Sequence, residues 1–199
     1  SGKQYTVTLH NPVQGTGHCS CPDFITNRLQ TCKHLIAVRH HLKERKGFKT
    51  AASNEIFPFI DIFWDSAREC PFVFYENLEN EPEEIRTAIT EYFDENGFFR
   101  SKDLGAFTAL LDLSGRSKRI RIAESVRNRL DKYWLNRQLD ELSKKVEPDF
   151  SCIKTRLYPY QEEGIRFVLF KKAALIGDEM GLGKTLQAIA ASILKKEIF

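Results

Sequence analysis

Hydrophobic and polar residues follow a different period in each part of the first fifty residues. Side chains alternate between apolar and polar over residues 4–9, which predicts a short strand with one buried face. Turn-forming residues occupy positions 11–17, and a second short strand is expected at His18–Cys21. From Cys32 to Gly47 the apolar residues recur at helical spacing, with basic residues on the other face. The pattern therefore predicts a strand, strand, helix module.

The pattern is less regular in the middle of the chain. Residues 48–81 hold aromatic patches divided by prolines and acidic residues, which predicts an irregular connector that lies on a neighbouring part and could contain a short strand near Phe72. Residues 82–148 then show helical spacing in three stretches. We expect these helices at about residues 82–96, 101–113 and 119–145.

The last segment, residues 149–199, shows a third pattern, in which short apolar and glycine-rich stretches alternate with helical spacing. Pro159 suits the first turn of a helix, and Ala173–Ile176 is a short apolar run that predicts a strand. A glycine-rich stretch at 177–183 follows, and a helix is expected from Lys184. Strand, glycine-rich loop and helix, in that order, are the parts of a phosphate-binding loop. Taken together, these elements predict the α+β class.

Composition and charge limit the possible environments and partners. The 199 residues are 42% hydrophobic and 29% charged, which permits a buried core. The start of the chain lacks an apolar signal region, and no run is long enough to cross a bilayer, so we expect an intracellular protein without membrane contacts. Lys and Arg outnumber Asp and Glu by eight to two in residues 1–50 and by ten to four in residues 114–146. These basic blocks either face nucleic acid or are ordinary solvated surfaces.

The five cysteines are unevenly placed, and three of them lie close together with a histidine. Cys19 and Cys21 form one pair, and Cys32 and His34 form another ten residues later. An odd number of cysteines without a secretory signal argues against disulfides, whereas thiolates with one imidazole are a common structural zinc set. The alternative is free cysteines near a surface histidine. His18 is expected to support the site or face solvent, His10 to lie at the surface, and Cys70 and Cys152 to be small buried residues.

The cysteine pattern and its surroundings resemble the SWIM zinc finger. The C-x-C and C-x-H pairs and the segments Cys21-Pro22-Asp23-Phe24 and Cys32-Lys33-His34-Leu35-Ile36 carry this resemblance over about residues 5–45. It implies that Zn²⁺ is bound structurally by Cys19, Cys21, Cys32 and His34. It also implies a role in contacts with DNA or with a protein partner.

The glycine-rich stretch ends as a variant of the Walker A motif. Gly181 and Gly183 would let backbone N–H groups point at phosphate oxygens, while Lys184 would neutralise them and Thr185 would bind Mg²⁺. Asp178 stands where the strict motif has its first glycine. Read alone, the stretch could also be a glycine-rich turn in a plain αβ unit.

The surroundings of this motif resemble the start of the Swi/Snf helicase-like ATPases. The resemblance is carried by Leu157-Tyr158-Pro159-Tyr160-Gln161-Glu162-Glu163-Gly164 and by the run from Gly177 to Ala190, in which Asp at 178 is usual for the family. It implies that Gln161 contacts adenine, and that ATP and Mg²⁺ are cofactors of the full-length protein. The expected nucleotide-binding residues are Gln161, Gly181, Leu182, Gly183, Lys184 and Thr185.

The sequence contains only a part of what such an ATPase needs. No second acidic motif for Mg²⁺ follows Thr185, so we expect no complete catalytic set here and an inactive chain by itself. The resulting hypothesis is the N-terminal piece of a bacterial, cytoplasmic, nucleoid-associated DNA translocase, with an incomplete RecA-like lobe. Its expected parts are a finger (1–47), a connector (48–81), a helical region (82–148) and the start of the ATPase lobe (149–199). The alternative is a non-enzymatic, zinc-dependent module that binds nucleic acid or protein.

Overall fold

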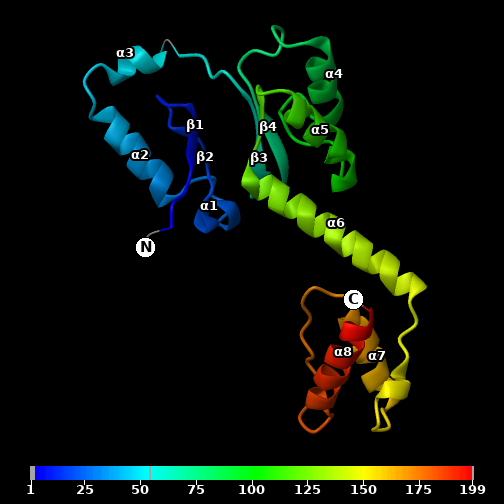
Figure 1. Ribbon diagram of the computed structural model, residues 1–199. Helices are drawn as coiled ribbons and strands as arrows, with labels where there is room; N and C mark the ends of the chain where they lie inside the picture. The colour runs from blue at the N-terminus through cyan, green and yellow to red at the C-terminus, as the bar shows by residue number, and fades with distance from the viewer. Residues whose placement is uncertain (1–2, 54, 199) are drawn as a thin grey trace. The chain divides into compact units, whose positions relative to one another are not determined.

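The structure is a computed structural model that describes residues 3–53 and 55–198. It divides into two compact units, residues 1–131 and 132–199, which are described separately here (Figure 1). Helices and small sheets occur together, which confirms the α+β class. The long helix α6 (Glu124–Lys145) begins in the first unit and ends in the second.

The first unit begins with the predicted strand, strand, helix module. An antiparallel hairpin of β1 (Val7–Asn11) and β2 (Thr16–Cys19) precedes α2 (Lys33–Lys43). A short helix α1 (Pro22–Thr26) lies between them, and α3 (Phe48–Ser53) follows. Gly17, at φ 159°, approaches β1 so closely that a Cβ atom would lie 2.0 Å from the carbonyl oxygen of Thr8, so only glycine fits there.

A three-stranded sheet forms the centre of the first unit. Its order is β4-β3-β5, with β3 (Ile60–Asp65) antiparallel to β4 (Cys70–Phe74) and parallel to β5 (Ile120–Ile122). The segment expected to be an irregular connector therefore contributes two regular strands. Pro71 lacks a backbone N–H, and it is tolerated because β4 is the last strand of the sheet and meets only an isolated bridge, between Phe72 and Phe98, on its other side.

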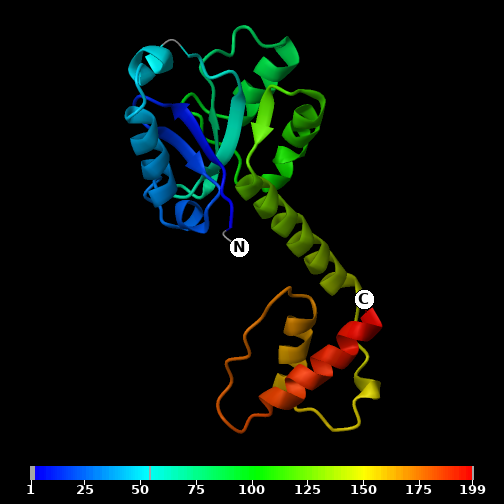
Figure 2. The same ribbon diagram turned by 60° about the vertical axis from the view of Figure 1, so that its left-hand side comes forward.

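Helices complete the first unit on the other side of this sheet. Helix α4 (Glu83–Tyr92) is followed by a 3₁₀ turn, η1 (Leu104–Phe107), and by α5 (Thr108–Arg116). In Figures 1 and 2 the hairpin lies between α2 and the sheet, whereas α4 and α5 lie beyond the sheet. The apolar core is therefore built on β3, whose Ile62 is fully buried.

The predicted third helix is shorter than expected at its N-terminal end. It begins at Glu124 rather than near residue 119, because Ile120 and Ile122 belong to β5. Both isoleucines are buried, with exposed Arg121 between them, which is the alternation of a strand with one buried face. The helical spacing of Ile122 with Val126 and Leu130 concealed this alternation.

The second unit is helical in the residues that the structure describes. A 3₁₀ turn, η2 (Phe150–Cys152), precedes α7 (Pro159–Leu169) and α8 (Lys184–Ile198), which pack together. Their contact buries Leu157, Ile165, Leu169, Phe170, Ala190, Ala191 and Leu194. The strand predicted at Ala173–Ile176 is absent, and Leu175 is 92% exposed. None of the helices in the described part of the chain combines the length and apolar character that crossing a membrane requires.

Candidate metal centre and phosphate loop

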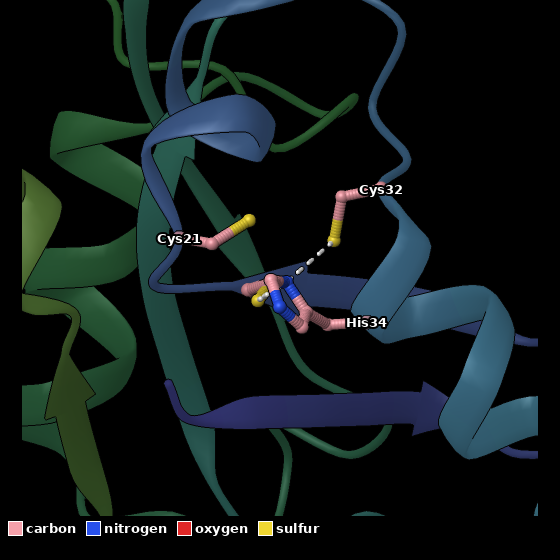
Figure 3. A group of neighbouring side chains, drawn as sticks. Cys21, Cys32 and His34 are labelled. Atoms are coloured by element: carbon pink, nitrogen blue, oxygen red, sulfur yellow. Dashed lines mark hydrogen bonds between the residues drawn. The ribbon is translucent and has the colours of Figure 1, made fainter. Parts of the chain in front are cut away.

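Four side chains from the predicted set meet in the first unit. The ligand atoms of Cys19, Cys21, Cys32 and His34, here called the Cys3His cluster, all lie within 4.8 Å of one another. The Sγ atoms of Cys19 and Cys32 are each 3.9 Å from Nδ1 of His34. A sulfur and a nitrogen bound to one tetrahedral Zn²⁺ are about 3.6 Å apart, so the cluster has the right size for this ion. Figure 3 shows Cys21 and Cys32 approaching His34 from separate segments.

Two of the cysteines also begin helices. Cys21 is the N-cap of α1, and its Sγ accepts a hydrogen bond from the N–H of Phe24 at 3.3 Å. Cys32 is the N-cap of α2, and its Sγ accepts from the N–H of Leu35 at 3.5 Å. N–H groups at a helix start stabilise a thiolate, which is the form of cysteine that binds metal. The local fold therefore supports these two thiols as ligands.

The cluster has its own small apolar core. Cys19, Cys21 and Cys32 are each at most 3% exposed, and Phe24 and Leu35 are buried with them. Burial is the main cause that raises the pKa of Cys19 to about 12. A bound cation would reverse this effect, because thiolates bind zinc only after losing their protons. With four ligand atoms converging, the arrangement suits a closed structural site with no open position.

A second group of polar side chains lies on the opposite face of the hairpin. Nε2 of His10 and Nε2 of His18 lie 2.7 Å and 2.9 Å from the same carboxylate oxygen of Asp61. Burial alone would raise the pKa of Asp61, but hydrogen bonds from both histidines outweigh it and lower the pKa to about 2. The expectation of a surface position for His10 is wrong, since it is 4% exposed. No sequence pattern predicted this group, because Asp61 is 51 and 43 positions from the two histidines along the chain.

The two remaining cysteines also differ from expectation. Cys70 in β4 is only partly buried, and Cys152 in η2 is exposed. Neither belongs to the Cys3His cluster.

The glycine-rich stretch of the second unit, residues 177–183, forms a loop directly before α8. Gly181 and Gly183 have φ values of 86° and 76°, a region that residues with a Cβ rarely adopt. The Nζ of Lys184 donates hydrogen bonds of 2.8 Å to the carbonyl oxygens of Asp178 and Glu179. The ammonium group is thus held against the loop, at the N-terminal end of a 15-residue helix. The combination suits an anionic ligand.

Two glutamines tie this loop to the helices. Gln161 is 4% exposed, and its amide accepts from the N–H of Tyr158 and donates to the carbonyl oxygen of Leu182. Gln187 donates to the carboxylate of Asp178 at 2.7 Å. In this arrangement both ends of the Gln161 amide are engaged within the protein, whereas Thr185 is exposed. The six residues predicted for nucleotide binding are therefore close together along α7, the loop and α8.

Comparisons with known proteins give short regions of similarity. A DNA annealing helicase and endonuclease, ZRANB3, is 44% identical over 61 residues in Mus musculus, 32% over 76 residues in Homo sapiens and 40% over 72 residues in Bos taurus. The matches involve 30%, 30% and 28% of this chain, but only 5%, 7% and 7% of those proteins. The chain thus spans a small fraction of the relatives. No protein-family model matches it, and no solved structure matches it.

Proposed function

We propose that the chain supplies a zinc-dependent DNA-binding module and the first phosphate-binding motif of an ATP-driven, helicase-like motor of the Swi/Snf type. Zn²⁺ would be bound by Cys19, Cys21, Cys32 and His34. The local similarity to a DNA annealing helicase supports a nucleic-acid-related role. The loop before α8 supports a phosphate ligand, since it combines positive-φ glycines with a lysine at a helix start.

The observation that carries the DNA-binding proposal is the double position of Cys32. This residue is a member of the Cys3His cluster and also the N-cap of α2. A metal bound there would fix the start of the helix. Lys33 and Lys43 on this helix, and Lys46 just after it, are exposed. A metal-fixed helix could therefore present ammonium groups to the phosphates of DNA, which supply most sequence-independent affinity.

DNA binding by the intact chain tests this proposal. Fluorescence anisotropy with a short duplex, across a salt series, should show binding that falls steeply with salt and is lost after zinc removal. Changing Lys33, Lys43 and Lys46 to Gln should reduce the slope of log affinity against log salt by about 2.7, or 0.9 for each phosphate contact. The matched control changes three exposed lysines elsewhere, Lys102, Lys172 and Lys196. If both triple variants lose DNA affinity and salt dependence equally, the proposal is wrong.

The loop of residues 177–183, here called the phosphate loop because we propose that it binds phosphate, requires a separate test. ATP, if bound, supplies the phosphate chain, and Mg²⁺ would accompany it. Lys184 would turn from its carbonyl partners to the phosphates, Thr185 would bind Mg²⁺, and Gln161 would exchange an internal hydrogen bond for adenine. Calorimetric titration with ATP and Mg²⁺ should show weak binding to the wild-type chain. We expect no hydrolysis, because no acidic motif for Mg²⁺ follows the loop in this sequence.

A protein-binding role for the module has one specific observation in its favour. Leu29 and Ile36 are 73% and 59% exposed, respectively, and both belong to the module that contains the Cys3His cluster. Large exposed apolar residues often mark contact surfaces. The two roles can be compared in the full-length protein. If the triple variant of Lys33, Lys43 and Lys46 keeps the activity of that protein and an Ile36→Ser variant loses it, protein binding is the better assignment.

A further inference from the structure

The hairpin separates two groups of side chains whose atoms could hold a metal ion. Cys19 pairs with Val7, and both belong to the apolar group around the Cys3His cluster. His18, the preceding residue, pairs with Thr8. Because successive side chains of a strand point to opposite faces, His18 is directed away from the cluster and towards β3. The hairpin therefore has a second face with its own chemistry.

Three side chains meet on that second face. His10 comes from β1, His18 from β2 and Asp61 from β3. Their ligand atoms lie within 4.8 Å of one another, and both imidazoles approach one carboxylate oxygen through Nε2. The side chains of His10 and Asp61 are 3% and 4% exposed, and that of His18 is 12% exposed.

Aromatic side chains fix the orientation of both imidazoles. The ring of His10 stacks on Phe74, with centroids 4.2 Å apart and an angle of 13° between the planes. The ring of His18 stacks on Phe63 at 4.8 Å and 11°. A pre-oriented pair of rings reduces the conformational freedom that must be lost when a ligand binds. The Nε2 atoms are thus held towards the carboxylate in advance.

We propose that His10, His18 and Asp61 form a second site for a divalent transition-metal ion, separate from the Cys3His cluster. Two imidazole nitrogens and a carboxylate oxygen are a common donor set for zinc and for ferrous iron. The ion takes the place of the two Nε2 protons that bond to Asp61. Each neutral imidazole releases its Nε2 proton to solvent and takes one up on Nδ1, so that Nε2 is free to bind the ion. Ligand atoms at about 2.05 Å from a tetrahedral ion lie about 3.3 Å apart. The two Nε2 atoms, at 2.7 Å and 2.9 Å from the Asp61 oxygen, must therefore each move away from it by about half an ångström.

The surroundings of the site leave room for a further ligand. His10 lines a cavity of about 450 Å³, and His18 and Asp61 line another of about 470 Å³. Three protein ligands with an open fourth position are typical of catalytic metal sites, whereas four protein ligands are typical of structural ones. Arg121 and Arg127 line the second cavity, so an anionic oxygen, such as that of phosphate or carboxylate, suits the open position.

Metal content of the intact chain tests this proposal. The chain is reconstituted with excess Zn²⁺, passed through a desalting column and analysed by mass spectrometry for metal per protein. We expect two zinc ions per wild-type chain and one in each of His10→Gln and Asp61→Asn. His40→Gln and His41→Gln, which change exposed histidines on α2, should keep two. One ion per wild-type chain, unchanged in His10→Gln, would overturn the second site whether or not any variant folds.

Cobalt distinguishes this site from the Cys3His cluster. Co²⁺ bound to thiolates gives an intense charge-transfer absorption that Co²⁺ bound to nitrogen and oxygen lacks. We expect His10→Gln to lose one equivalent of Co²⁺ and keep this absorption. Cys32→Ser should lose the absorption and both equivalents, because His10 and His18 belong to the same hairpin as Cys19. Loss of the absorption in His10→Gln would place that cobalt at the thiolates and overturn the assignment. A wild-type chain without the absorption would instead count against the proposed zinc module alone.

Discussion

The two units of this chain contain a sequence motif each, and they differ in how completely the motif is built. In the first unit, all four members of the Cys3His cluster converge around a core of their own. In the second, the phosphate loop rests on two helices, and the described residues contain no strand beside it. A motif whose partners lie within about fifteen residues assembles locally. If the loop binds phosphate as proposed, it would rest on a parallel sheet whose strands lie outside the described residues.

The source of stability should also differ between the two units. The first module has few apolar residues, so its stability would depend on a bound metal, whereas α7 and α8 bury a continuous apolar contact. The following predictions test this difference, beginning with the largest expected effect.

Removing a ligand of the Cys3His cluster should unfold the first module. Structural zinc contributes about 10–16 kcal/mol of apparent binding free energy in small zinc modules, so Cys32→Ser or a chelator should abolish its fold. Hydrogen exchange followed by mass spectrometry would show loss of protection in residues 5–45, with residues 157–198 unchanged. Cys152→Ser, at an exposed position of the second unit, is the matched control. Retained protection in the chelated protein would contradict a metal-dependent fold.

Truncating the apolar contact should destabilise the second unit without involving metal. Ile165 is fully buried between α7 and α8, so Ile165→Ala should lower the free energy of unfolding by about 2–5 kcal/mol. Phe167 on the same helix is 60% exposed, and Phe167→Ala should change the free energy of unfolding much less. Denaturant titration of both variants, with and without chelator, provides the measurement. If the loss of unfolding free energy in Ile165→Ala changes when chelator is added, the second unit also depends on metal, and the proposed difference between the units is wrong.

Changing Lys184 should weaken nucleotide binding and leave the fold intact. A charge-assisted hydrogen bond contributes about 1.5–3 kcal/mol, so Lys184→Ala should reduce the affinity for ATP by about tenfold or more. Lys172→Ala, at an exposed lysine of the same unit, should have no comparable effect. Calorimetry with each variant would measure this. Equal affinity in Lys184→Ala and the wild type would rule out Lys184 as a phosphate ligand.

The sequence was a better guide to the Cys3His cluster than to the sheet behind it. Cys19, Cys21, Cys32 and His34 are close along the chain, so their spacing predicted their meeting. The contact of His10 with Asp61 joins residues 51 positions apart, and no periodicity reports such a contact. Strand β5 has only three residues, too few to outweigh the helical spacing that follows it. The strand expected at Ala173–Ile176 lacks a partner for its backbone hydrogen bonds in the described residues.

The smallest predicted effects concern the two glycines of the phosphate loop. Both have positive φ, so replacement by alanine costs about 1–2 kcal/mol of strain at either position. At Gly181 a Cβ atom would meet nothing within 4 Å, whereas at Gly183 it would lie 2.5 Å from Nε2 of Gln161. Gly183→Ala should therefore also displace Gln161 from Leu182, and it should lower the thermal midpoint of the second unit more than Gly181→Ala. If the two variants have the same thermal midpoint, the hydrogen bond between Gln161 and Leu182 does not stabilise the loop. The loop would then have even fewer stabilising contacts than the contacts of α7 and α8 suggest.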